Sequence, residues 1–165
     1  MNRPSMPPIT LRPSRPSDAD AVIALLMGTY HATWEPHLRP EAAARFGTGK
    51  HAIKYVEGYL DQFTVAERAG QVVGMVHARG DFLDALHVLP ACQGEGIGGR
   101  LLAVAEEGMR REGLAMARLE TDTFNERSRA FYRRHGYVET DTYPDEEWDS
   151  GFTTVLMTKP LIRKG

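Results

Sequence analysis

The 165-residue sequence has little of what several protein classes require. Its single cysteine, Cys92, excludes an internal disulfide and fits a reducing compartment. With a formal net charge of −2, it lacks the basic excess that nucleic-acid binding over a whole face needs. No stretch approaches the ~18 apolar residues of a membrane span, and the N-terminus lacks the apolar core of a signal peptide. We therefore expect a cytoplasmic protein that binds neither nucleic acid nor a membrane.

What is present is typical of a globular protein. Hydrophobic residues make up 42% of the chain and charged residues 25%. The length fits one domain with one core. Residues 1–8 contain three prolines and no periodicity, which predicts a flexible N-terminus. Residues 9–165 are then expected to form a single domain.

Changes in hydrophobic periodicity divide this domain into strands and helices. Alternating apolar residues predict strands, and apolar residues at helical spacing predict helices. The strands are expected at 9–12, 63–67, 72–78, 82–88, 115–121, 137–142 and 152–158. The helices are expected at 17–30, 41–46, 53–60, 98–111 and 125–135, with a proline-containing loop at 31–40. The order predicts a βαβ core in a mixed sheet, an α/β or α+β fold.

A glycine-rich loop lies at the centre of this pattern. The strand at 82–88 leads into Gln93-Gly94-Glu95-Gly96-Ile97-Gly98-Gly99, and a helix follows. Glycine tolerates positive φ and has no side chain to hold a ligand away, so the backbone N–H groups can converge on one point. The start of the following helix adds about half a positive charge. The loop therefore predicts an anion site, most naturally for a phosphate or pyrophosphate.

Several kinds of glycine loop have to be compared. A P-loop requires Lys followed by Ser or Thr, whereas here Gly98 is followed by Gly99 and Arg100. A dinucleotide fold places its loop on the first strand with an acidic residue ~20 positions later. Glu120 and Asp122 fall loosely in that window, but this loop lies in mid-chain after a hairpin. A glycine turn without any ligand is the third alternative.

Two motifs together resemble a known family. Residues 93–98, after the strand ending Leu86-His87-Val88-Leu89-Pro90, resemble the acyl-CoA pyrophosphate loop of the GNAT N-acetyltransferase superfamily. Residues 125–137, Asn-Glu-Arg-Ser-Arg-Ala-Phe-Tyr-Arg-Arg-His-Gly-Tyr, resemble its second signature at the expected spacing. The resemblance covers about residues 9–161 and is weakest between 30 and 60. It implies a mixed, mostly antiparallel seven-stranded sheet flanked by about four helices, with the loop in a central βαβ unit.

The resemblance also implies a binding site for acetyl-CoA as cosubstrate. Backbone groups of the loop would hold the pyrophosphate, and Val88, expected at a bulge, would offer an N–H to the thioester carbonyl. Glu95 departs from the family, which often has Lys or Arg there, so its side chain is expected to face solvent. The expected cofactor-binding residues are Leu86, Val88, Gln93, Gly94, Glu95, Gly96, Ile97, Gly98, Gly99, Arg100, Asn125 and Tyr132.

Two side chains are candidates for the chemistry. The hydroxyl of Tyr132 is expected to face the departing sulfur, and an aromatic packed under the sheet is the alternative. A phenol has a pKa of ~10 against ~8.5 for a thiol, so a hydrogen bond is favoured over full proton transfer. His87 has the best intrinsic pKa for a general base. Asp84, Glu120 and Asp122 are alternatives that would need a raised pKa.

The acceptor is less defined. Acidic residues fill 139–149 without a basic residue, and in this family the last loop often borders the acceptor site, which favours a cationic amine. A solvated acidic loop explains the same pattern. Trp34, Glu35, Asp84 and Trp148 are the expected acceptor-binding residues.

The resulting expectation is an N-acetyltransferase. It would move an acetyl group from acetyl-CoA to a primary amine, on a small molecule or a peptide, by direct attack in a ternary complex. No spacing of histidine or carboxylate suggests a metal site, and relatives frequently dimerise, so a homodimer is an expectation from resemblance. The competing hypothesis is a non-catalytic acetyl-CoA sensor or interaction module, which would have no use for a hydroxyl at the sulfur.

Overall fold

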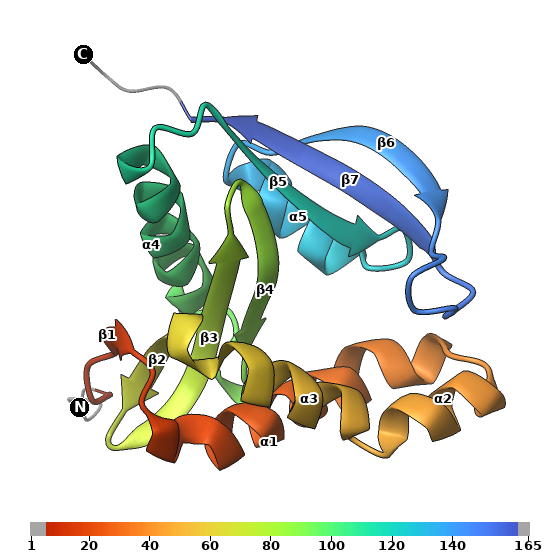
Figure 1. The fold of residues 1–165 in the computed structure, drawn as a ribbon, viewed down its shortest axis with the longest axis horizontal. Helices are drawn as coiled ribbons and strands as arrows, with labels where there is room; N and C mark the ends of the chain where they lie inside the picture. Colours follow the sequence, from red (N-terminus) through yellow and green to blue (C-terminus); the bar gives the residue numbers. More distant parts are fainter. Residues whose placement is uncertain (1–5, 162–165) are drawn as a thin grey trace, which may run out of the picture.

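The computed structural model describes residues 6–161, so residues 1–5 of the expected flexible segment lie outside the described part. Seven strands form one sheet, with five α-helices around it (Figure 1). The strands are β1 (Thr10–Pro13), β2 (Thr64–Arg68), β3 (Gln71–Arg79), β4 (Phe82–Val88), β5 (Met116–Asp122), β6 (Val138–Pro144) and β7 (Thr153–Pro160). The helices are α1 (Ala19–Thr29), α2 (Pro40–Gly47), α3 (Lys50–Tyr59), α4 (Ile97–Arg111) and α5 (Glu126–Arg134). Shorter helical turns are η1 (Pro16–Asp18), η2 (Tyr30–Trp34), η3 (Glu35–His37), η4 (Leu60–Gln62) and η5 (Pro90–Cys92).

The sheet is mixed, as predicted. Its strand order is β1-β2-β3-β4-β5-β7-β6, and only the β4–β5 pair is parallel. The parallel pair needs a crossover, and α4 supplies it. The result is the expected βαβ unit, extended on both sides by antiparallel strands.

Helices cover both faces of the first half of the sheet. Helix α4 packs on β2, β3 and β4 with Leu101 and Leu102 in one core cluster. Helix α1 packs on the other face, where Leu25 and Phe63 belong to a second cluster. Because β3 lies between these layers, residues 72–77 are all buried, a pattern unlike the alternation of a half-exposed strand.

The sheet splits at its centre. The ladder between β4 and β5 contains only the pairs Phe82–Arg118 and Leu83–Leu119. Beyond these pairs the two strands diverge, so β1–β4 and β5–β7 form two halves that separate in Figure 1. The split exposes backbone groups that a continuous sheet would pair.

One expectation differs from the structure. Pro36 and Pro40 interrupt the helical pattern, which predicts a loop over residues 31–40. Instead, α1 continues into the π-helical turn η2 and the 3-10 turn η3. Pro36 lies in the first turn of η3 and Pro40 at the first position of α2, where the missing N–H costs nothing. Among residues 6–161, no helix is long and apolar enough to cross a membrane.

Candidate active site

A cleft of 1130 Å³ lies where the sheet splits. Its walls come from the end of α1 with η2 and η3, from the diverging parts of β4 and β5, and from the glycine loop with the starts of α4 and α5. Segments far apart in the sequence therefore meet in one concave space, which is the usual setting of a ligand site.

The glycine loop forms one end of the cleft. Gly94 and Gly96 have φ of 85° and 83°, a conformation that L-residues with a side chain rarely adopt. Gly98 has a different role, since a Cβ there would lie 3.3 Å from Cζ of Phe131 on α5. The first two glycines thus turn the backbone into the start of α4, and Gly98 lets α5 pack closely against it.

The backbone of β4 faces the cleft beside this loop. Leu89 N–H donates to Val73 O at 2.8 Å, so by the alternation of an antiparallel pair the N–H groups of Leu86 and Val88 point to the opposite side, toward β5. There the β4–β5 ladder has already ended. Gln93 Nε2 donates to Val88 O at 3.2 Å, which leaves the Val88 N–H as the donor directed into the cleft.

The bulge in β4 is not where it was expected. Val88 pairs regularly with Gly74, whereas the register shifts where Ala85 pairs with His77 and Leu83 with Ala78. The extra residue is therefore Asp84, four residues before Val88. The N–H of Val88 lacks a partner strand because β5 diverges and not because β4 bulges there.

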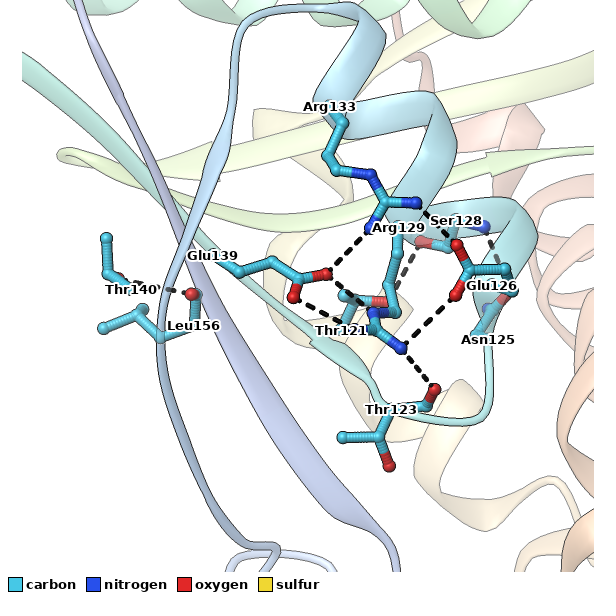
Figure 2. Close-up of polar contacts among 10 residues, drawn as sticks. All are labelled: Thr121, Thr123, Asn125, Glu126, Ser128, Arg129, Arg133, Glu139, Thr140 and Leu156. Carbon is cyan, nitrogen blue, oxygen red and sulfur yellow. Dashed lines mark hydrogen bonds and ion pairs between the residues drawn. The ribbon is translucent and has the colours of Figure 1, made fainter.

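Helix α5 is fixed from two sides. Asn125 Oδ1 accepts from Ser128 N–H at 3.1 Å, which confirms the predicted helix cap. Arg129, which does not line the cleft, donates to both carboxylate oxygens of Glu139 on β6 at 2.7 and 3.0 Å, and Arg133 joins Glu139 to Glu126, a residue of the cleft lining (Figure 2). These contacts hold the cleft-lining residues of α5 in place.

Tyr132 is buried, but its hydroxyl has no hydrogen-bond partner in the described part of the chain. The side chain is 9% exposed and packs edge-on against Phe131 and Tyr137. No described residue forms a hydrogen bond with its hydroxyl, and no described buried side-chain polar atom lacks a partner, so this hydroxyl opens into the cleft. Burial raises the pKa of Tyr132. The hydroxyl therefore stays protonated and can donate a hydrogen bond to a ligand.

His87 lines the cleft and is oriented by Thr29. The Thr29 hydroxyl donates to Leu26 O at 3.0 Å and lies 2.8 Å from His87 Nδ1. A hydroxyl has one hydrogen, so Nδ1 is the donor in the second contact and Nε2 keeps its lone pair. Burial lowers the pKa of His87 to about 4, which keeps the ring neutral at neutral pH.

Four carboxylates line the cleft, and the pKa values of Asp84, Glu120 and Asp122 are shifted in different ways. Burial favours a raised pKa at Asp84, but hydrogen bonds from His77, Arg79 and Tyr55 outweigh it and lower the pKa to about 2. Burial raises the pKa of Asp122 against the effect of the Trp34 indole, whose N–H donates to Asp122 Oδ2 at 2.9 Å.

The pKa of Glu120 is shifted in the same direction as the pKa of Asp122. Burial raises its pKa, and the Tyr143 hydroxyl opposes that effect. Glu120 and Asp122 therefore keep the property expected of an alternative base, and Asp84 does not.

The structure brings together all but three of the predicted site residues. Those that line the cleft are Trp34, Asp84, Leu86, His87, Val88, Gln93, Gly94, Gly96, Ile97, Gly98, Gly99, Arg100, Asn125 and Tyr132. Cleft-lining residues that sequence reasoning missed include Thr29, Phe124, Arg127, Phe131 and Arg134. A helical-face analysis would have found Arg127 and Arg134, seven positions apart, whereas nothing local marks Thr29 as a partner of His87.

The remaining three lie outside the cleft lining. Glu95 turns to Arg68, whose guanidinium donates to both of its carboxylate oxygens at 3.3 Å, so it is exposed as expected but also ion-paired. Glu35 Oε2 lies 2.6 Å from His31 Nδ1 on the preceding turn η2. Trp148 is 48% exposed and packs near His51 on α3. Among residues 6–161, no group of three or more His, Cys, Asp or Glu is placed to hold a metal ion.

Fold and cleft together define an α/β domain with a ligand site at a split in its sheet, beside a glycine loop and a helix start. The model of the acetyltransferase (GNAT) family matches residues 19–137. The uncharacterized N-acetyltransferase YhfO of Bacillus subtilis is 25% identical over 162 residues, covering 92% of this chain and 99% of the relative. The aminoalkylphosphonate N-acetyltransferase of Salmonella typhimurium is 34% identical over 88 residues, covering 47% of this chain and 57% of the relative.

A solved structure has the same fold. The PaiA N-acetyltransferase of Thermoplasma acidophilum, solved in complex with coenzyme A, superposes with a TM-score of 0.78 at 19% identity, covering 93% of this chain and 99% of that one. The chain belongs to the acetyltransferase (GNAT) family. It is accordingly an enzyme of the acyltransferase class.

Proposed function

We propose that this enzyme transfers an acetyl group from acetyl-CoA to the nitrogen of a primary amine in a ternary complex. The observation that carries the proposal is the end of the β4–β5 ladder at Leu83, because it places an open strand edge next to both the glycine loop and Tyr132. An extended pantetheine arm can bond to such an edge as an added strand does. We also propose that residues 9–165 act as one N-acetyltransferase domain.

The residues of the cleft fit acetyl-CoA as cosubstrate. The loop between Gln93 and Gly98 presents backbone N–H groups at the start of α4, which suits a pyrophosphate. The Tyr132 hydroxyl is a protonated donor without a partner among residues 6–161. Bound acetyl-CoA would supply the activated acetyl group as a thioester.

Each residue then has a defined task in the transfer. The neutral amine nitrogen bonds to the thioester carbonyl carbon, the carbon–sulfur bond breaks, and coenzyme A leaves as a thiolate that takes a proton from water to become the free thiol. The Val88 N–H stabilises the negative charge that develops on the carbonyl oxygen. The Tyr132 hydroxyl donates a hydrogen bond to the departing sulfur. His87 Nε2 accepts a hydrogen bond from the attacking nitrogen and receives its proton as the new amide forms.

The acceptor would enter from the side of η2 and β5. Trp34 and Asp122 form a wall there, and Glu120 and Asp122 bring two carboxylates to β5. The arrangement favours a small amine that carries a positive charge. The aminoalkylphosphonate acceptor named for one relative carries an anionic group, and the carboxylates of this chain argue against a close copy of that substrate. A peptide amine as acceptor, a homodimer and a cytoplasmic location stay predictions.

The proposal is tested by the release of free thiol from acetyl-CoA. Polyamines, aminoglycosides, amino acids and lysine peptides are supplied in turn as acceptors, and the acetylated product is identified by mass spectrometry. We expect at least one cationic small amine to accelerate thiol release. Binding of acetyl-CoA without acceleration by any amine would contradict the proposal and favour the sensor hypothesis.

Tyr132→Phe serves as the matched variant in the same assay. It removes one oxygen and keeps the ring that packs against Phe131 and Tyr137. Loss of one charge-assisted hydrogen bond of roughly 1.5–3 kcal/mol should lower kcat by about ten- to a hundredfold with little change in acetyl-CoA affinity. An unchanged kcat would assign Tyr132 to packing alone.

A further inference from the structure

Helix α5 carries four arginines that divide into two groups. Arg129 and Arg133 form ion pairs with Glu139 and Glu126 on the side shown in Figure 2. Arg127 and Arg134 line the cleft instead, and no described carboxylate pairs with either of them. Two of the arginines are therefore paired with carboxylates of the protein, whereas Arg127 and Arg134 face the cleft.

Arg127 and Arg134 lie on one face of α5. Seven residues correspond to almost two complete turns, so the two side chains leave the helix in nearly the same direction, with a separation of about 10 Å along its axis. Phe131 lies between them and contacts the start of α4 at Gly98, while His135 contacts Gly99. The two arginines therefore border a groove whose floor is the contact between α4 and α5.

Arg127 and Arg134 line the same cleft as the glycine loop. Val88 and Tyr132 mark the thioester end of the cleft, and the loop before α4 marks the pyrophosphate. In coenzyme A the ribose and its 3′-phosphate follow the pyrophosphate, so they would lie beyond the loop along α4 and α5. Arg100, the third arginine in the cleft lining, is partly committed, since its Nη1 donates to Ile9 O at 3.3 Å.

We propose that Arg127 and Arg134 form the binding site for the 3′-phosphate of coenzyme A and make the enzyme select CoA over 3′-dephospho-CoA. The inference rests on the proposed function and adds a recognition element to it. A phosphate monoester carries nearly two negative charges near neutral pH, and the guanidinium group binds such oxygens through paired N–H donors. Glu126, the carboxylate closest in sequence, also lines the cleft, but each of its two oxygens is already paired, one with Arg129 and one with Arg133.

The test compares two ligands that differ only in the 3′-phosphate. Dissociation constants for CoA and 3′-dephospho-CoA are measured by titration calorimetry with the wild type, Arg127→Gln, Arg134→Gln and the double variant. Arg111→Gln is the control, because it removes the same charge from the last turn of α4, where the side chain is 78% exposed and does not line the cleft. Thermal unfolding of each variant verifies that it folds.

We expect the wild type to bind CoA about tenfold more tightly than dephospho-CoA, the effect of one charge-assisted contact at a partly exposed site. The double variant should bind both ligands equally, with dephospho-CoA affinity changed less than about threefold, and added salt should reduce the wild-type preference. Arg111→Gln should keep that preference.

Three results would overturn the inference. If the double variant kept the preference for CoA, the arginines would not contact the 3′-phosphate. If it lost affinity for both ligands equally, they would bind the pyrophosphate instead. If the wild type bound neither ligand, the proposed function itself would fail, which separates that outcome from the other two.

Discussion

At the residue scale, the contact between Thr29 and His87 determines which ring nitrogen is available for catalysis. Thr29 is 3% exposed, and its hydroxyl is fixed by the carbonyl of Leu26. Its remaining lone pairs accept the Nδ1–H of His87, so Nε2 is the basic nitrogen. With a pKa near 4, the ring needs no deprotonation before it can accept a proton at neutral pH.

This arrangement predicts different effects for two substitutions of Thr29. Thr29→Val keeps the shape and removes the hydroxyl, so the imidazole loses its fixed tautomer; Thr29→Ser keeps the hydroxyl. A lost hydrogen bond of about 1 kcal/mol should lower kcat for amine acetylation five- to tenfold in Thr29→Val, with acetyl-CoA affinity unchanged. Thr29→Ser should retain most of the activity. Steady-state kinetics on both variants is the measurement, and an equal loss in the two would make Thr29 a packing residue only.

At the scale of elements, the position of α5 depends on the absence of side chains at the start of α4. Phe131 occupies the space over Gly98, and His135 occupies the space over Gly99, where a Cβ would lie 3.0 Å from the ring. The same helix carries Asn125 and Tyr132 into the cleft. A shift of α5 by a few tenths of an ångström would therefore also displace Asn125 and Tyr132 in the proposed cofactor site.

Two glycine-to-alanine substitutions in α4 should separate an effect on CoA binding from an effect on the stability of the fold. Gly98→Ala places a methyl group 3.3 Å from Phe131 and should displace α5, weakening CoA binding by roughly 1 kcal/mol. Gly108→Ala lies in the same helix with no heavy atom within 4 Å of the new methyl group, and it should stabilise the fold by about 0.5–1 kcal/mol without changing CoA affinity. Titration calorimetry and urea unfolding measure the two effects. Equal CoA affinity in both variants would contradict the packing argument.

The sequence predicts elements well where the signal is local. The strand at 82–88 and the helix near 98–111 were predicted almost to the residue, because apolar periodicity and the flanking glycines mark them. The turn η2 was missed because its stability depends on a distant contact, the hydrogen bond from Trp34 to Asp122, 88 positions later. A local proline signal cannot report such a contact.

The same distinction applies to the cleft. The glycine loop and the cap at Asn125 are local motifs and were identified from the residues and the family resemblance. Glu35 lies outside the cleft beside its pair with His31, four positions earlier, which helical spacing indicates only if residues 31–35 are taken as helical. Trp148 lies outside the cleft beside rings on α2 and α3, and sequence alone does not reveal those distant contacts. The bulge at Asp84 depends on the register with β3, a long-range property.

At the scale of the whole molecule, His87 lies where the two sheet halves and α1 meet. It belongs to β4, bonds to Thr29 at the end of α1, and has Trp34, the partner of Asp122 on β5, at a ring-centroid distance of 5.9 Å. Burial in this junction lowers its pKa to about 4. Protonation of one side chain is therefore coupled to the packing of three parts of the fold.

This coupling predicts a defined response to acid. Between a pKa of about 6.5 in the unfolded chain and about 4 in the folded one, the unfolded state binds the extra proton, so the free energy of unfolding falls as the pH is lowered through this window.

His87→Gln removes this contribution of His87 to the pH dependence. The variant should be less stable than the wild type at pH 7, where it loses the fixed contact with Thr29, but the difference should shrink as the pH falls toward 4. His51→Gln, at an exposed position on α3, is the matched control substitution. Urea unfolding followed by circular dichroism at several pH values between 7 and 4 gives the three slopes, and parallel curves for the wild type and His87→Gln would show that His87 is not held neutral by the fold.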